Sequence, residues 1–383
     1  MTDDRIRKIV ANLPAMENVR AVWAEADERL ARGDAGFAAD LGVALTAAYG
    51  TGGGGDVWQY RGVFDHLLRL LATTPGPGHC AHALRLVAAA AEAGRRLDRY
   101  AASLLAGGQP AAELATAFTA DAPDELRACL LHELVLRKVP VTETPGIAEW
   151  AASPYPSRHP LGRLPLTLCD VEGRPELPRH GPGGTGHAVP YGPAGHRGAL
   201  QGGSAGPVPA AEETTTDAGA RRMARAVANW AEESNGRVEA REFALAAPPA
   251  AGAVPETLLS LGLACLREPS PRNPFAVVPC PPAEAWRMLF AAASLGGAYN
   301  SGLGGAYGRL AAWESLAALA GVAEGAGAED AGVGEVEARA GECAWYGFVA
   351  DTAWFEQVAW DLALAAVGAE GRRLAVLAAT DTD

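Results

Sequence analysis

The sequence of 383 residues is 49% hydrophobic and carries a formal net charge of −13. The length suits about two or three domains, and the hydrophobic fraction is high enough for real cores, which excludes a wholly disordered chain. An acidic chain without a run of lysine and arginine is expected to bind neither nucleic acid nor an anionic membrane surface, because both depend on attraction to basic side chains.

The N-terminal stretch and the cysteines indicate a cytoplasmic protein. The stretch MTDDRIRKIV has early acidic residues and no apolar run, so it is unlike a secretory signal. No segment offers ~20 consecutive apolar residues, so we expect no membrane span. The cysteines are widely scattered and form no CxxC pair, so we expect reduced, mostly buried thiols. They are Cys80, Cys129, Cys169, Cys265, Cys280 and Cys343.

Residues 1–140 are predicted to be helical. Between residues 57 and 71, apolar side chains recur at spacings of three and four, which places them on one helical face. They are Val57, Tyr60, Phe64, Leu67, Leu68 and Leu71. Weaker stripes cover 81–93 and 124–139, and breaks rich in glycine and proline separate the segments. Several such helices with short connections predict an antiparallel bundle or a HEAT-like stack.

Residues 141–216 are dense in proline and glycine, as in ELPRHGPGGTGHAVPYGPAGHRG. Proline lacks the N–H that a helix needs and glycine is entropically costly to order, so no long regular element is expected. The region is predicted to be a connecting arm, either packed over a neighbouring domain or disordered. Within it, Leu164, Leu166 and Leu168 alternate as in a short edge strand, despite Pro165.

Residues 217–383 alternate between helical and strand patterns. Thr216 or Asp217 can cap the first helix of this region. Strands are predicted at RVEAREFAL (237–245) and FAVVP (275–279), and helices at PAEAWRMLFAAAS and RLAAWESLAALAG. The region is therefore predicted to be an α+β domain.

The next segment, residues 321–342, is mostly glycine, alanine and acidic residues, with Arg339 as its one basic residue. A segment with few large apolar side chains and many like charges can bury little surface. We therefore expect a solvated, mobile loop.

The end of the chain is predicted to form a three-stranded antiparallel meander. In FEQVAWDLALAAV, apolar side chains of one parity alternate with more polar neighbours, as in a strand. They are Val358, Trp360, Leu362 and Leu364. A helix starting after Asp351 fits almost as well, but GAEG (368–371) supplies a hairpin turn and favours the meander. Trp345, Trp354 and Trp360 are expected to pack between the meander and the helix of Trp313. The whole fold is predicted to be mainly helical α+β.

The segments AWRMLFAAASLGGAYNSGLGGAYGRLAAWESL and LAVLAATDTD resemble a family of uncharacterised actinobacterial, Streptomyces-type proteins known as a domain of unknown function. The resemblance covers roughly the last hundred residues. It implies no activity and no catalytic residues.

The glycine-rich stretch LGGAYNSGLGGAYGR (295–309) is the most conspicuous motif. A dinucleotide loop needs G-x-G-x-x-G between a strand and a helix, but here the motif that starts at Gly302 has Tyr307 in its sixth position, and a helix precedes it. A Walker loop is excluded because no G-K-[ST] follows.

Two interpretations of this stretch remain. Gly304, Gly305 and Arg309 could hold an anion at the start of the next helix. The favoured alternative is a joint between two helices, with Tyr299 and Tyr307 packed as anchors. The small size and positive φ that such a joint needs are expected from Gly296, Gly297, Gly304 and Gly305. Under this alternative, Arg309→Ala is expected to have little effect on stability.

Other candidate sites are weaker. HCAH (79–82) places two histidines on one helical turn, but no further metal ligands can be assigned, so we predict no metal site and no cofactor. Every histidine lies between residues 66 and 196, which excludes a triad within 217–383 alone. Asp381 and Asp383 could bind Mg²⁺ or a hydroxylated ligand, although a solvated chain end is favoured.

No set of catalytic residues is recognisable. The favoured function is a non-enzymatic protein-interaction module with another protein as partner. The alternative is a metal- or anion-dependent enzyme with a site between the helical and α+β domains, which would use the arm histidines, Arg309 and the terminal aspartates.

Overall fold

A computed structural model describes residues 2–51, 57–120, 122–155, 158–187, 200–201, 206–268, 275–322, 332–355 and 360–382. The chain folds into two compact units. The first contains Met1–Gly162 and Pro178–His187, and the second contains Arg163–Leu177 and Ala188–Asp383. The predicted arm, residues 141–216, is thus divided between them.

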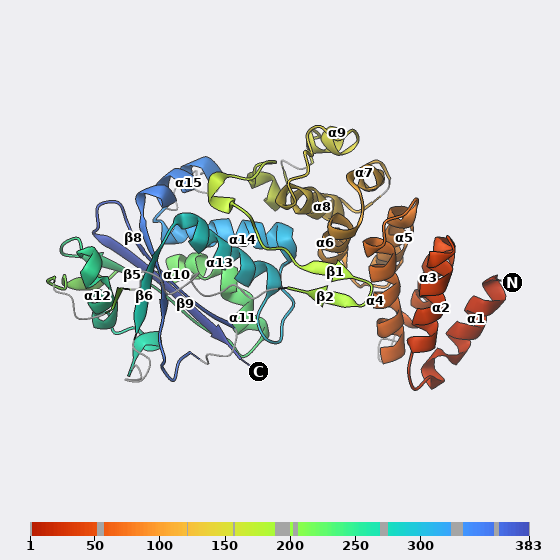
Figure 1. The fold of residues 1–383 in the computed structure, drawn as a ribbon, viewed down its shortest axis with the longest axis horizontal. Helices are drawn as coiled ribbons and strands as arrows, with labels where there is room; N and C mark the ends of the chain where they lie inside the picture. Colours follow the sequence, from red (N-terminus) through yellow and green to blue (C-terminus); the bar gives the residue numbers. More distant parts are fainter. Residues whose placement is uncertain are drawn as a thin grey trace. The chain divides into compact units, whose positions relative to one another are not determined.

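The first unit is helical, as predicted, and its helices follow one another along the unit (Figure 1). They are α1 (Thr2–Asn12), α2 (Arg20–Ala31), α3 (Ala35–Tyr49), α4 (Trp58–Thr73), α5 (His79–Glu92), α6 (Asp98–Gly108), α7 (Ala111–Thr119), α8 (Asp124–Leu136) and α9 (Ile147–Ala151). Helix α3 packs against α4 and α5, and α6 packs against α4 and α8. The predicted apolar stripe of α4 is buried from Tyr60 to Leu71.

A hairpin completes the first unit. Strands β1 (Arg179–Gly181) and β2 (Gly184–Gly186) pair antiparallel, with His180 opposite Thr185. Strand β1 lies against α4 and α6.

The second unit is built on an antiparallel seven-stranded sheet with the order β3-β6-β7-β8-β9-β5-β4. Its strands are β3 (Leu200–Gln201), β4 (Ala211–Glu213), β5 (Arg237–Leu245), β6 (Ala276–Cys280), β7 (Ala344–Val349), β8 (Trp360–Val367) and β9 (Arg373–Asp381). Strands β7, β8 and β9 form the predicted meander, and β5 has the predicted bounds.

Helices cover both faces of this sheet (Figure 1). They are α10 (Asp217–Met223), α11 (Ala228–Glu233), α12 (Val254–Ser260), α13 (Pro282–Leu295), α14 (Gly304–Leu319) and α15 (Val333–Glu342). On one face, α12 joins a core that contains Phe243, Val277 and Phe348. On the other face, α13 and α14 contact the meander, and Trp286 of α13 stacks on Phe290 with ring centroids 4.9 Å apart.

Three local predictions are wrong. The alternation at Leu164–Leu168 forms no strand, because the carbonyls of Pro165 and Thr167 accept hydrogen bonds from a side chain instead. In the predicted loop 321–342, residues 332–342 contain α15, whose Val336 and Ala340 are buried one turn apart; residues 323–331 lie outside the described residues. Trp354 packs on the α12 face of the sheet, which is the wrong side. Trp345 lies on the opposite face, the side of the Trp313 helix, as predicted.

No helix among the described residues is both long and apolar enough to cross a membrane. All six cysteines are free.

Candidate functional site

The glycine-rich stretch connects α13 to α14, as the joint interpretation predicts. Gly296 and Gly304 have φ of 84° and 75°, a region that favours glycine, whereas Gly305 lies within α14 without positive φ. A Cβ on Gly308 would lie 2.7 Å from the Cβ and 2.8 Å from the Cα of Ser294. The small residue is therefore what lets the two helix backbones touch.

Arg309 is fully buried and ion-paired. Its Nη2 lies 2.8 Å from Oε2 of Glu172, and its Nε contacts Oε1 of the same carboxylate. Nη1 and Nη2 also donate to the carbonyl oxygens of Pro165 at 2.9 Å and Thr167 at 3.0 Å. Trp313 Nε1 donates to Glu172 Oε1 at 2.9 Å. An anion would have to displace Glu172 to reach Arg309. The burial and the ion pair also contradict the expectation that Arg309→Ala has little effect on stability.

Asp381 is also buried, with 1% of its surface exposed. Its Oδ2 accepts from Ala298 N at 2.7 Å and its Oδ1 accepts from Ser234 Oγ at 2.9 Å. A Cβ on Gly297 would overlap this carboxylate. Asp381 therefore fastens the glycine-rich loop to the end of β9 and is not a solvated chain end. Asp383 lies outside the described residues.

Asn300 provides the second anchor of the loop. Its Oδ1 accepts from Gly297 N at 2.9 Å, and its Nδ2 donates to Asn229 O at 2.9 Å. Tyr299, predicted to be an anchor, is instead 61% exposed. The loop is therefore held by hydrogen bonds to Asp381 and Asn300 and not by packing of the Tyr299 ring.

The HCAH segment shows no metal geometry. His79 Nδ1 lies 2.8 Å from Thr74 O, and His82 Nδ1 faces Arg85 at 3.3 Å. The described part of the chain contains no group of three or more His, Cys, Asp or Glu residues placed to hold a metal.

The thiols are poorly suited to nucleophilic chemistry. Burial raises the pKa of Cys80, Cys169 and Cys280 to about 11. Because the thiolate is the reactive form, these three thiols stay protonated and unreactive near neutral pH.

Ser103 and His180 form a pair that sequence spacing does not reveal. Ser103 Oγ lies 3.0 Å from His180 Nε2, and His180 Nδ1 lies 2.9 Å from Thr185 Oγ1. Burial, together with the nearby Arg137 charge, lowers the pKa of His180 to about 4. A catalytic base is normally oriented by a carboxylate, but a hydroxyl stands here, and Ser103 is buried on α6. The pair fastens the hairpin to the helices.

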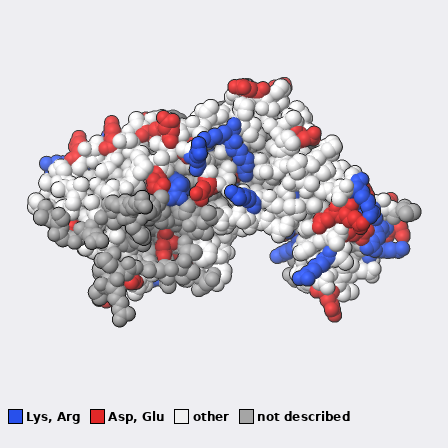
Figure 2. Space-filling model, viewed as in Figure 1, with Lys and Arg blue, Asp and Glu red and all other residues white. Residues whose placement is uncertain are grey.

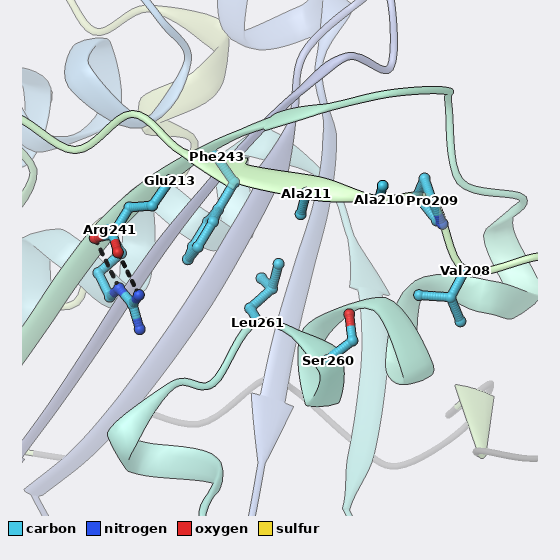
Figure 3. Close-up of a pocket in the computed structure, with 9 residues that line it drawn as sticks. All are labelled: Val208, Pro209, Ala210, Ala211, Glu213, Arg241, Phe243, Ser260 and Leu261. Carbon is cyan, nitrogen blue, oxygen red and sulfur yellow. Dashed lines mark hydrogen bonds and ion pairs between the residues drawn. The ribbon is translucent and has the colours of Figure 1, made fainter.

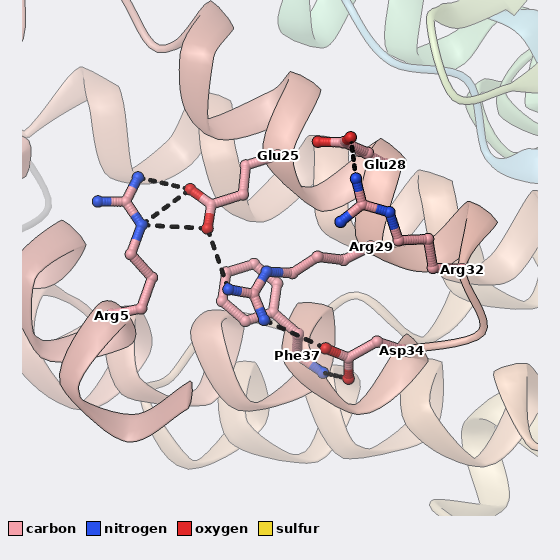
Figure 4. Close-up of polar contacts among 7 residues, drawn as sticks. All are labelled: Arg5, Glu25, Glu28, Arg29, Arg32, Asp34 and Phe37. Carbon is pink, nitrogen blue, oxygen red and sulfur yellow. Dashed lines mark hydrogen bonds and ion pairs between the residues drawn. The ribbon is translucent and has the colours of Figure 1, made fainter. Parts of the chain in front are cut away.

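A charged depression of about 770 Å³ lies over α1–α3 (Figure 4). Arg5 and Arg29 both bind Glu25, Arg29 also binds Asp34 at 3.2 Å, and its guanidinium lies 3.9 Å from the ring centroid of Phe37. Figure 2 shows acidic and basic side chains mixed on the surface of these N-terminal helices. Because the charges compensate one another locally, this surface has the character of a solvated ion-pair network.

A second depression, of about 540 Å³, lies beside the last strand of the sheet (Figure 3). Phe243 and Leu261 form its buried apolar part, and Val208 is 42% exposed at its rim. At one end, Arg241 Nε donates to Glu213 Oε1 at 3.0 Å, and the same Arg241 hydrogen bond lowers the pKa of Glu213. We call this depression the β4 pocket.

Strand β4 stands at an edge of the sheet, paired with β5 on one side. Ala246 N donates to Ala210 O and Thr214 N donates to Glu242 O, each at 2.8 Å. Antiparallel pairing alternates along a strand, so the backbone groups of residues 210, 212 and 214 face β5. The N–H and C=O groups of Ala211 and Glu213 therefore point away from β5, toward the outer edge of the sheet.

The match to known families spans nearly the whole chain. A model described as a family of unknown function (DUF6183) matches residues 20–383. The chain belongs to this family. The resemblance seen in the last hundred residues thus extends through both units, and the family brings no activity. No curated protein and no solved structure matches the chain.

Sequence reasoning missed the β4 pocket because β4 lies in the region assigned to the arm. Its one local signal is AAEETTT (210–216), a run without proline or glycine between Pro209 and the α10 cap. Three exposed residues are too short a strand for a period of two to be recognised.

Proposed function

We propose that this member of the family is a non-enzymatic interaction module that binds an extended segment of another protein along the outer edge of β4, which faces no further strand among the described residues. The observation that carries the proposal is the outward direction of the Ala211 and Glu213 backbone groups. An edge of this kind is a template for a further strand, whose main-chain hydrogen bonds supply affinity.

The β4 pocket gives this edge a means of selection. Ala211 lies opposite Leu245 and Glu213 lies opposite Phe243, so these four side chains share one face of the sheet. Phe243 and Leu245 belong to the core on that face. A strand added to β4 would place alternate side chains on the same face, next to the pocket.

The enzymatic alternative gains less support from the described residues. Arg309 and Asp381, two of its proposed ligands, hold Glu172 and the amide of Ala298 within the second unit. Using Arg309 for a ligand would leave the buried Glu172 carboxylate without its cation, and using Asp381 would release the half-buried amide of Ala298, and both changes are unfavourable.

A displayed library of random peptides tests the proposal. We expect enriched peptides that bind the wild-type protein and lose binding to Ala211→Pro, because proline removes one outward N–H and none of the N–H groups that face β5. Ala211→Val, which keeps the N–H, is the matched control, and thermal unfolding verifies that both variants fold. Failure to enrich any peptide, or equal binding to Ala211→Pro, would overturn the proposal.

A further inference from the structure

We infer that the segment bound at β4 is basic and amphipathic, with positively charged side chains on the face occupied by Glu212 and apolar side chains on the pocket face. This inference rests on the proposed function and specifies its partner.

The position of Glu212 sets the charge preference. Glu212 lies opposite Ala244, so its exposed side chain projects from the face opposite the β4 pocket. If Ala211 and Glu213 bond to an added antiparallel strand, one residue of that strand lies directly opposite Glu212. Opposite charges in this arrangement attract and like charges repel.

The pocket face has a different preference. Glu213 is already bound by Arg241 and also accepts from Thr215 Oγ1 at 2.8 Å, so its charge is compensated within the protein. Next to this pair, Phe243 and Leu261 line the pocket with little exposed surface, and the exposed Val208 adds an apolar side chain at the rim. An aliphatic side chain fits this face better than a second cation, because a cation would have to compete with Arg241 and lose its hydration.

The same geometry disfavours a second copy of the chain as the occupant. Two β4 strands that pair antiparallel through Ala211 and Glu213 would be related by a twofold axis at Glu212. Glu212 would then face its own copy, and like charges directly opposite are destabilising. The formal net charge of −13 adds repulsion between copies. A basic segment of another protein meets neither obstacle.

Three short capped peptides test the inference, in which valine alternates with lysine, with glutamine or with glutamate. We expect the lysine peptide to bind wild-type protein most tightly and to weaken as salt rises. Glu212→Lys should weaken the lysine peptide at least about threefold and strengthen the glutamate peptide. Glu335→Lys is the control: it makes the same charge change on exposed α15 and should leave the order of the peptides unaltered.

The outcomes separate the two proposals. If the glutamine or glutamate peptide binds as tightly as the lysine peptide and Ala211→Pro abolishes this binding, the charge inference is wrong and the proposed function stands. If Glu335→Lys weakens the lysine peptide as much as Glu212→Lys does, attraction is to overall charge and the inference is wrong. If no peptide binds, or if Ala211→Pro has no effect on binding, both proposals are wrong.

Discussion

Arg309 has a different role in the structure from the one that its sequence context suggests. Beside a run of glycines at a helix start, an arginine is typical of an anion site. Its partner Glu172 precedes it by 137 positions in the chain and lies in the proline- and glycine-rich region, so no local pattern could have revealed the pair. A buried guanidinium needs a carboxylate and further acceptors, and the chain supplies both.

Breaking this pair should be costly. We expect Arg309→Ala to lower the free energy of unfolding by ~3–5 kcal/mol, because the buried Glu172 carboxylate is left without its cation. Urea denaturation measures the loss. Arg225→Ala, which removes an exposed arginine paired with Glu314, should cost less than about 1 kcal/mol. A loss for Arg309→Ala as small as that of its control would show that the pair is dispensable.

His180 predicts a pH dependence of the first unit. Its pKa is lowered to about 4 in the folded protein, against about 6.5 in an unfolded chain. As the pH falls, His180 therefore binds its proton in the unfolded state before it does so in the folded state. The stabilisation from neutral His180 is complete above about pH 6.5 and is lost as the pH falls toward 4. The difference in unfolding free energy between the wild-type protein and His180→Gln should shrink over this interval. A difference that does not change with pH would contradict the assignment.

Among the elements, the α13–α14 joint depends on glycine for close approach rather than for flexibility. Gly308 lies inside α14, where a Cβ would meet Ser294 backbone atoms at 2.8–2.9 Å. Backbone atoms cannot move aside as a side chain can, so the helices would have to separate.

Two helical glycines give a matched comparison. We expect Gly308→Ala to lower the free energy of unfolding by ~1–3 kcal/mol through overpacking. Gly334→Ala in α15 should raise it by up to ~1 kcal/mol, because a Cβ there has open space and alanine favours the helix. Thermal or urea unfolding checks both, and equal effects would refute the close-approach argument.

Long elements with a clear apolar period could be predicted from the sequence, whereas short ones could not. The alternation in β5 and β8 and the stripe of α4 each extend over enough residues to establish a period. Strand β4 has three residues, and α15 shows only Val336 and Ala340 as buried positions. The candidate site depends on β4. Because this strand is too short to show a period, its position beside β5 could not be inferred from the local sequence pattern.

For the whole molecule, the second unit begins earlier in the chain than a composition boundary suggests. Residues 163–177 belong to it and supply Glu172, Pro165 and Thr167 to Arg309. The α+β unit is therefore completed by a segment that its sequence pattern assigns to a connecting arm.

Two fragments test this boundary. We expect the fragment 163–383 to unfold cooperatively in urea, because it contains every described partner of Arg309. The fragment 217–383 should be markedly less stable or insoluble, since it lacks Glu172 and also β4. Equal stability of the two fragments would show that residues 163–216 are not part of the folded unit.

The central claim is that the outer edge of β4 binds an added strand. Residue-resolved amide hydrogen exchange with and without the lysine–valine peptide tests this claim most directly. The amides of Ala211 and Glu213 should exchange rapidly in the free protein and become protected at saturating peptide, because they gain strand partners. The amide of Thr214, which already donates to Glu242, should change little. Unchanged exchange at Ala211 and Glu213 with the peptide bound would contradict the claim.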